Sequence, residues 1–210
     1  MFVPESNRYV ERDNGIREDV DHRTFSDVKP VFDRRHGSVT PANASQITDA
    51  AAAMLLMEEE KAKSLGLPIL GYVKDYTDFG YDPTCMGLAP VGAIAKLLAK
   101  TRLGLKDFAV CEINEAFASV VLGINRILAS SSLMERKFGR YGFTERLGEI
   151  PPDDLNPHGG AIALGHPVGV SGLRLAMTSL FELKRRDAER ALISMCVGGG
   201  QGVAMIVERT

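Results

Sequence analysis

The chain has 210 residues, of which 45% are hydrophobic and 25% are charged, and its formal net charge is −2 at pH 7. This balance is typical of a folded globular protein rather than a disordered one, and the small charge gives no reason to expect nucleic acid or an anionic membrane as partner. No run approaches the roughly 20 apolar residues of a membrane-spanning helix, and residues 1–12 are too polar for a secretory signal.

Residues 1–36 differ in composition from the rest of the chain. They are rich in Glu, Asp and Arg, their apolar residues are isolated, and neither the strand period nor the helix period persists. The composition fits a surface arm or linker, and it fits a partly ordered tail equally well.

Ordered structure is expected to begin near Gly37, with a short β-prone run over 38–40 and a turn over 41–45. From residue 47 to residue 63 the apolar residues recur at helical spacing, and the charged end of this segment is followed by a glycine that predicts the helix end. A strand over 68–73 follows. These elements predict a β–α–β unit.

The remaining sequence predicts further helices and strands. The expected helices cover 91–100, 114–128 and 172–186, and the expected strands cover 109–113, 191–196 and 203–207. The polar, proline-containing segment 130–156 is interpreted as an inserted loop. The last two strands are apolar almost throughout, which is typical of strands buried on both faces. This alternation predicts an α/β layered fold.

The first cluster with chemical potential is Asn114-Glu115-Ala116-Phe117, at a predicted strand-to-helix junction. Ligands commonly bind at the carboxyl ends of strands in α/β sheets, and the Asn114 amide could point at a substrate oxygen, directly or through a water. Taken alone, the cluster is better explained by Asn114 capping the helix, with Glu115 favoured in its first turn.

The second cluster is the glycine-rich segment 156–172, in which His166 stands between Gly165 and Pro167. A constrained backbone fixes this histidine, and an imidazole can activate a nucleophile or donate to an oxyanion. Phosphate binding by the glycines is a rival interpretation, although neither standard nucleotide-binding motif is matched. His158 is interpreted as structural.

The third cluster is Cys196, which ends a predicted strand two residues before the glycines of segment 198–200. Main-chain N–H groups there could form an oxyanion hole, and a thiol with a lowered pKa can move protons. Considered singly, Cys196 is better explained as a small buried residue. Cys85 and Cys111 are interpreted as structural, and cysteine usage without metal or disulfide spacing favours a reducing, cytoplasmic compartment and no metal site.

Together, the three clusters resemble the thiolase family in order and in spacing. Further similar stretches are 13–17, 29–32, 37–45 and 86–90, so that the resemblance runs from about residue 12 to residue 209 and corresponds to the family's C-terminal half. It implies a layered thiolase-like α/β fold with three parts: a loop-domain remnant over 1–37, the last β–α–β portion of the N-terminal domain over 38–83, and the C-terminal domain over 84–210.

The resemblance also implies roles for individual residues. His166 would activate the nucleophilic cysteine and help hold the thioester oxygen, and Asn114 would position a water in that oxyanion hole. Cys196 would be the general acid/base on the acetyl α-carbon, and the backbone N–H of Gly198 would join a second oxyanion hole. Contacts to coenzyme A would involve Ser45, Ala116 and Phe117. Coenzyme A and acyl-CoA would be substrates, with no permanently bound cofactor.

One element of the family pattern is missing from this resemblance. The nucleophilic cysteine belongs to the N-terminal half of thiolases, and Cys85 and Cys111 lack its glycine and small-residue setting. We therefore expect the chain to be inactive alone and to need an N-terminal thiolase half or a partner chain, in a homo- or hetero-oligomer. Apolar surface left by the absent half would need a partner to cover it.

The implied reaction is thiolysis of a 3-ketoacyl-CoA in fatty acid β-oxidation, or the reverse Claisen condensation. Segment 130–156 and the 13–17 stretch resemble thiolases of the trifunctional β-oxidation complex, but those enzymes carry His at the position of Asn114. An acetoacetyl-CoA thiolase is therefore the alternative. A ketosynthase would carry histidine in place of Cys196, a non-catalytic coenzyme A or acyl-chain binding protein would need neither His166 nor Cys196, and a structural subunit is a further alternative.

Overall fold

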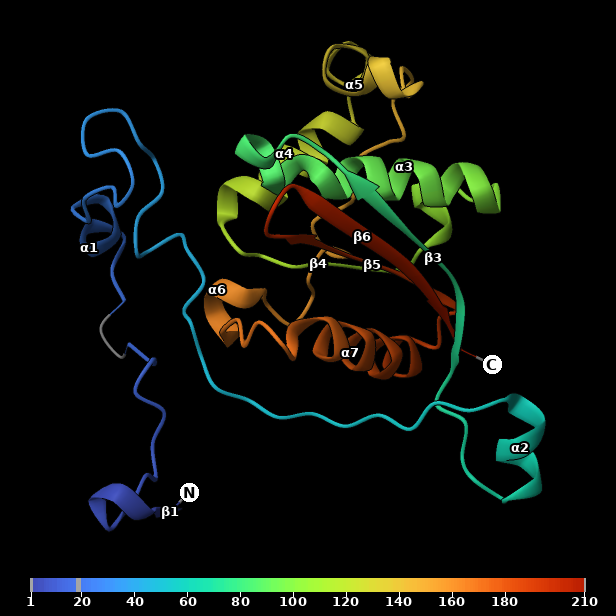
Figure 1. Cartoon of the computed structure of the whole chain (residues 1–210), viewed down its shortest axis with the longest axis horizontal. Helices are drawn as coiled ribbons and strands as arrows, with labels where there is room; N and C mark the ends of the chain where they lie inside the picture. The colour runs from blue at the N-terminus through green and yellow to red at the C-terminus, as the bar shows by residue number, and fades with distance from the viewer. Residues whose placement is uncertain (1, 18–19, 210) are drawn as a thin grey trace. The chain divides into compact units, whose positions relative to one another are not determined.

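The computed structural model describes residues 2–17 and 20–209 and divides into two units, Met1–Ala42 and Asn43–Thr210. Figure 1 follows the chain from its N-terminal end to its C-terminal end. The first unit holds only short elements: β1 (Phe2–Val3), the 3-10 turn η1 (Pro4–Ser6), β2 (Arg8–Tyr9) and α1 (His22–Ser26). Strands β1 and β2 pair antiparallel. The strand expected over 38–40 is absent from this unit, so that prediction was wrong.

The helix predicted from 47 to 63 was also largely wrong. Residues 45–58 form no regular element, and α2 covers only Glu59–Ser64. Apolar residues at helical spacing stabilise a helix only when they pack against another surface. Ile47 is 95% exposed, so this segment lacks such a surface. The short helix forms where local signals suffice, with acidic residues in its first turn, basic residues in its last, and Gly66 at φ +65 just beyond it.

The second unit is built on one mixed sheet with the strand order β3-β6-β5-β4. The strands are β3 (Tyr72–Gly80), β4 (Val110–Ile113), β5 (Arg190–Val197) and β6 (Gln201–Glu208). Strand β4 pairs parallel with β5, and β6 pairs antiparallel with both of its neighbours. The last three strands were predicted nearly to their ends, whereas the strand predicted over 68–73 actually begins at Tyr72 and continues to Gly80.

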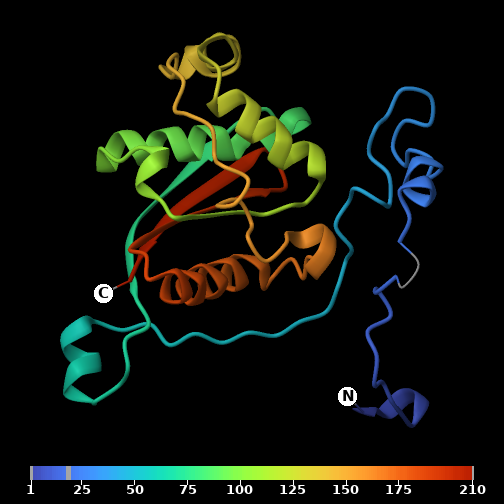
Figure 2. The same cartoon turned by 180° about the vertical axis from the view of Figure 1, so that it is seen from behind.

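Helices cover both faces of the sheet, which confirms the predicted α/β layered fold. Helices α3 (Ala89–Thr101) and α4 (Ala118–Leu128) lie on one face, and α6 (Ala161–Leu164) and α7 (Ser171–Arg186) lie on the other (Figures 1 and 2). Two buried apolar clusters fill these layers. On α7 the sequence correctly placed Ala176, Leu180 and Leu183 inward, but Leu173 and Met177 are only half-buried.

The segment 130–156 is not the inserted loop that its polarity suggested. It contains α5 (Ser131–Phe138), capped by the Ser130 hydroxyl, and the 3-10 turn η4 (Gly139–Tyr141). Its scattered apolar residues Met134, Phe138 and Ile150 are fully buried. Two further 3-10 turns, η2 (Pro83–Leu88) and η3 (Leu105–Asp107), flank α3. Across the described ranges 2–17 and 20–209, no helix is long and apolar enough to span a bilayer.

Candidate active site

The predicted site residues gather where β4 and β5 end. Asn114 directly follows β4, and Cys196 is the second-last residue of β5. Because these strands are parallel, with Ile113 opposite Ser194, their carboxyl ends lie at the same edge of the sheet. This edge is the usual location of ligands in α/β sheets.

His166 is held by three hydrogen bonds. Its backbone N–H donates to the carbonyl of Gln46 (3.0 Å), its Nδ1 lies 2.6 Å from Ser171 Oγ, and its Nε2 lies 3.3 Å from Asn114 Nδ2. Gly165, just before it, has φ +88, and a Cβ there would meet Thr48 Oγ1 at 2.6 Å. The glycine therefore allows both the backbone turn and the close approach that place this imidazole.

These contacts favour one tautomer of the His166 ring. The Ser171 hydroxyl also contacts the Pro167 carbonyl at 3.2 Å, which can only accept. If the hydroxyl donates there, Nδ1 of His166 must donate to it, and Nε2 then accepts from the Asn114 amide. The imidazole is neutral in this arrangement. Its pKa is lowered, first by burial and then by the positive charge of Arg174, so neutrality near pH 7 is favoured.

Asn114 is a linking residue rather than a helix cap. Its backbone N–H donates to the Ser194 carbonyl (2.9 Å), and the N-cap of α4 is Phe117, so that both the capping interpretation and the predicted helix start at 114 were wrong. The side chain is 1% exposed, and its Oδ1 is buried without a hydrogen-bond partner in the part of the chain that the structure describes. Such an atom is available to a water or a ligand group.

Cys196 and Gly198 lie in and just after the end of β5. Burial raises the pKa of the Cys196 thiol, so the protonated form dominates at neutral pH and can donate a proton. The thiol belongs to the same buried cluster as Ala116. Among the described hydrogen bonds, none joins Cys196 to Asn114 or His166. The thiol is related to these two side chains by its position at the same edge of the sheet.

The turn after Cys196 depends on glycine. Gly199 and Gly200 have φ of +86 and +85, and the Gly200 carbonyl accepts from the Tyr81 N–H at 2.6 Å. A Cβ on Gly202 would lie 2.4 Å from the carbonyl carbon of Ala89. Gly198 itself is exposed, with open space around its Cα. Its main chain is accessible to a ligand.

The expected coenzyme A contacts Ser45, Ala116 and Phe117 lie together beside Asn114. The Ser45 N–H donates to the Ala116 carbonyl (3.0 Å), and the Ala118 N–H donates to the Asn43 carbonyl (2.9 Å). These bonds and the antiparallel bridge between Ala44 and Phe117 hold the two segments side by side. This pairing also explains why α4 begins four residues later than predicted.

Glu115 bears on the rival phosphate interpretation. Its Oε2 accepts the backbone N–H of Ile162 (3.2 Å) at the start of α6, and a Cβ on Gly160 would lie 2.2 Å from the same oxygen. A carboxylate therefore occupies the helix start that an anion would need. In the described part of the chain, no group of three or more His, Cys, Asp or Glu side chains could hold a metal ion.

Sequence reasoning missed residues that hold the site in place. Ser171 orients the His166 ring through Nδ1. The only sequence signal for this contact is that Ser171 follows His166 by five residues. Asn156 bonds both backbone groups of Ile113, accepting at 2.8 Å and donating at 2.9 Å. Beside it, the Cys111 N–H donates to the Asp154 carbonyl (2.7 Å). His158 Nε2 lies 2.7 Å from the buried Glu182 carboxylate, in line with its interpretation as structural.

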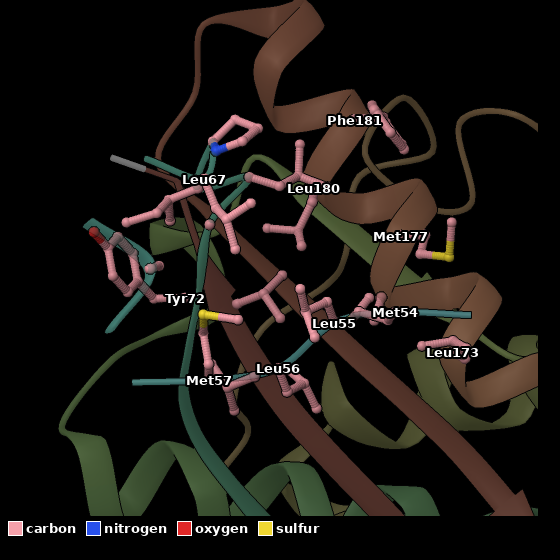
Figure 3. Close-up of a pocket in the computed structure, with 18 of the residues that line it drawn as sticks. Met54, Leu55, Leu56, Met57, Leu67, Tyr72, Leu173, Met177, Leu180 and Phe181 are labelled. Carbon is pink, nitrogen blue, oxygen red and sulfur yellow. The ribbon is translucent and has the colours of Figure 1, made fainter. Parts of the chain in front are cut away.

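An apolar groove of about 720 Å³ lies along α7. Figure 3 shows side chains of α7 facing those of the irregular segment before α2. The labelled lining residues are Met54, Leu55, Leu56, Met57, Leu67, Tyr72, Leu173, Met177, Leu180 and Phe181. Several remain open to solvent, with Leu55 at 72% and Leu56 at 70% exposed. A patch of this kind is typical of a surface that another chain segment covers.

Comparison with known proteins gives consistent matches. The model of the thiolase C-terminal domain matches residues 67–209, and that of the thiolase N-terminal domain matches residues 2–60. A 3-ketoacyl-CoA thiolase of Serratia proteamaculans is 39% identical over 208 residues, covering 99% of this chain and 47% of the relative. A probable acetyl-CoA acyltransferase of Staphylococcus aureus is 40% identical over 200 residues, covering 95% of this chain and 45% of the relative.

Solved structures agree. The dimeric peroxisomal thiolase of Saccharomyces cerevisiae matches with a TM-score of 0.81 at 36% identity, over 99% of this chain and 47% of its own. Human mitochondrial 3-ketoacyl-CoA thiolase, solved in complex with CoA, matches with a TM-score of 0.76 at 35% identity, over 94% of this chain and 45% of its own. The chain thus spans about half the length of the relatives it matches.

Proposed function

The chain belongs to the thiolase family, and from this premise we propose that it supplies the acid–base half of a thiolase-type acyltransferase, an acetyl-CoA C-acyltransferase. The observation that carries the proposal is the position of the His166 ring, which is held between Ser171 and Asn114 at the carboxyl edge of the sheet. The proposed reaction is thiolysis of a 3-ketoacyl-CoA to acetyl-CoA and a shortened acyl-CoA, or the reverse condensation.

In the degradative direction, a cysteine of the N-terminal half attacks the 3-keto carbon after His166 Nε2 takes its proton. The tetrahedral oxyanion is held by N–H groups that include that of Gly198. Its collapse releases acetyl-CoA as an enolate, whose oxygen is stabilised by His166 and by a water on the buried Asn114 Oδ1. Cys196, with its raised pKa, then protonates the enolate carbon. Coenzyme A finally accepts the acyl group.

Coenzyme A is the proposed shared substrate of both half-reactions, bound without a permanent cofactor. The contacts proposed for its pantetheine arm are Ser45, Ala116 and Phe117, whose backbones are tied together next to Asn114. The division into 1–37, 38–83 and 84–210 remains part of the proposal, as does a cytoplasmic site of action in fatty acid β-oxidation.

The proposal includes a partner. It is an N-terminal thiolase half, in the same assembly, that brings the nucleophilic cysteine and covers the apolar groove. Exposed Leu55 and Leu56 support this part of the proposal. Without that half we expect no turnover. The alternative substrate is acetoacetyl-CoA, favoured by asparagine at position 114, and a non-catalytic CoA-binding or structural subunit is the alternative function.

The test is to assay the purified chain alone and after co-expression with an N-terminal thiolase half. Coenzyme A-dependent cleavage of acetoacetyl-CoA and of a longer 3-ketoacyl-CoA is followed by loss of the 3-ketoacyl-CoA absorbance. We expect turnover only when the two halves are co-expressed. In that preparation, His166→Ala or Cys196→Ala should lower the rate of cleavage about a hundredfold or more. The matched controls His36→Ala and Cys85→Ala should retain activity. Turnover by the chain alone, or full activity of His166→Ala, contradicts the proposal.

A further inference from the structure

Two ionisable side chains, Glu112 and Arg174, are buried next to the His166 site without a hydrogen-bond partner among the described residues. Glu112 is 0% exposed, and neither of its carboxylate oxygens has a hydrogen-bond partner in the described chain. All three guanidinium nitrogens of Arg174 are likewise buried and unpartnered among the described residues. Unpaired buried charges are costly, and where they persist they call for an explanation beyond packing.

Their positions relate them to the two residues that hold the imidazole. Glu112 lies on β4, two residues before Asn114, whose backbone continues the pairing with β5 just beyond the strand end. Arg174 follows Ser171 by three residues on α7. Residues two apart in a strand, and residues three apart in a helix, lie on the same face. Glu112 and Arg174 therefore lie next to the row of hydrogen-bonded side chains formed by Ser171, His166 and Asn114.

The other charged groups around the ring are already engaged or exposed. On α7, Glu182 accepts from Arg185 and Arg186 and contacts His158. Glu115 accepts from the Ile162 backbone. The segment at Gln46 adds only Asp49, which is exposed. Arg174 is thus the cation acting on His166, and Glu112 is the carboxylate facing that cation.

We propose that Arg174 is a positioning residue whose buried positive charge keeps the His166 ring neutral, so that Nε2 is unprotonated and can take a proton from a nucleophile. The inference rests on the proposed function for the role of His166, but it concerns a property of the chain itself. Arg174 lowers the pKa of His166 after the larger effect of burial. It also opposes the burial that raises the pKa of Glu112 to about 7.

The direction of each effect follows from charge. A cation near the imidazole disfavours the imidazolium, so removing it should raise the pKa of His166. Burial raises the pKa of Glu112 to about 7, so this carboxyl is mostly protonated where His166 titrates, and removing it should leave the pKa of His166 nearly unchanged. Glu112→Gln therefore separates an electrostatic role from loosened packing. Loosened packing hydrates the ring and raises its pKa in both variants, whereas loss of the cation raises it only in the Arg174 variant.

The experiment is an NMR titration of the imidazole ring signals in the purified chain, which has four histidines. The His166 signal is assigned by its loss in His166→Gln. For Arg174→Met we expect an upward shift of the midpoint by about one pH unit. Arg174→Lys, which keeps the charge, should stay near wild type. Glu112→Gln should also stay near wild type, because the carboxyl that it replaces is mostly protonated at the His166 midpoint.

An unchanged His166 midpoint in folded Arg174→Met, or an upward shift in Glu112→Gln, overturns the inference. If Arg174→Met does not fold, as judged by circular dichroism, Arg174→Gln takes its place, with the same expected upward shift and the same refuting outcome. Because no turnover is measured, the outcome is independent of whether a partner half restores thiolysis.

Discussion

The three consecutive glycines after Cys196 differ in what an added methyl group would meet. Gly198 has open space, whereas Gly199 has φ +86 with only a Gln201 side-chain nitrogen at 4.0 Å. Gly200 has φ +85, and a Cβ would lie 2.4 Å from the Tyr81 carbonyl oxygen and 2.9 Å from the Pro83 nitrogen. Alanine at each position therefore separates backbone conformation from steric overlap.

The expected losses of unfolding free energy are graded. Gly198→Ala should change it by no more than about 0.5 kcal/mol. Gly199→Ala places a side chain in the left-handed region, which costs roughly 1–2 kcal/mol. Gly200→Ala carries the same cost and adds overlap with backbone atoms that cannot swing aside, for a total of roughly 2–5 kcal/mol.

Urea denaturation followed by circular dichroism measures all three variants under one condition, and similar slopes with denaturant would show that the same surface unfolds. The expected order of midpoints is wild type and Gly198→Ala together, then Gly199→Ala, then Gly200→Ala. Equal losses for Gly199→Ala and Gly200→Ala would refute the close approach of the turn to Tyr81, and a large loss for Gly198→Ala would refute its open setting.

Three further outcomes are expected. The pKa of buried Glu182 is lowered to about 2, chiefly by hydrogen bonds from Arg185. The contribution of Glu182 to the free energy of unfolding is therefore complete above the unfolded pKa near 4.5 and is lost as pH falls toward 2. Wild-type urea midpoints should fall between pH 6 and pH 3, and Glu182→Gln should reduce this fall. Burial raises the pKa of Cys111 to about 12, so native-state iodoacetamide labelling read by mass spectrometry should modify half-buried Cys85 first. Leu55→Lys should reduce self-association in sedimentation, because Leu55 is 72% exposed in the apolar groove.

The sequence predicted best the elements whose signals are local and whose packing surface lies within the chain. Helix α7 has a continuous apolar face, and β5 and β6 are apolar almost throughout, so each was found within a few residues. The segment from Ile47 has a comparable apolar pattern but remains irregular and exposed. Periodicity reports that a segment is suited to burial, and it does not supply the surface that buries it.

The sequence predicted site residues where a motif places them in a constrained backbone, as with His166. The contact between His166 and Asn114 arises because the fold brings two such motifs together. The supporting residues were not predictable. Arg174 is a charged residue within an amphipathic helix pattern, and Glu112 is a polar residue in a short strand. Only the packing of α7 against the sheet makes them neighbours of the imidazole.

The hydrogen bonds from Asn156 and Asp154 to β4 have a consequence for how copies of this chain can meet. Strand β4 is an outer strand, and the loop satisfies backbone groups that would otherwise invite another strand. The opposite outer strand, β3, carries Lys74, Asp75 and Asp78, charges that disfavour such pairing. Neither edge strand is thus suited to pairing with a strand of another molecule. Copies of this chain should associate through the apolar groove along α7 rather than by extending the sheet.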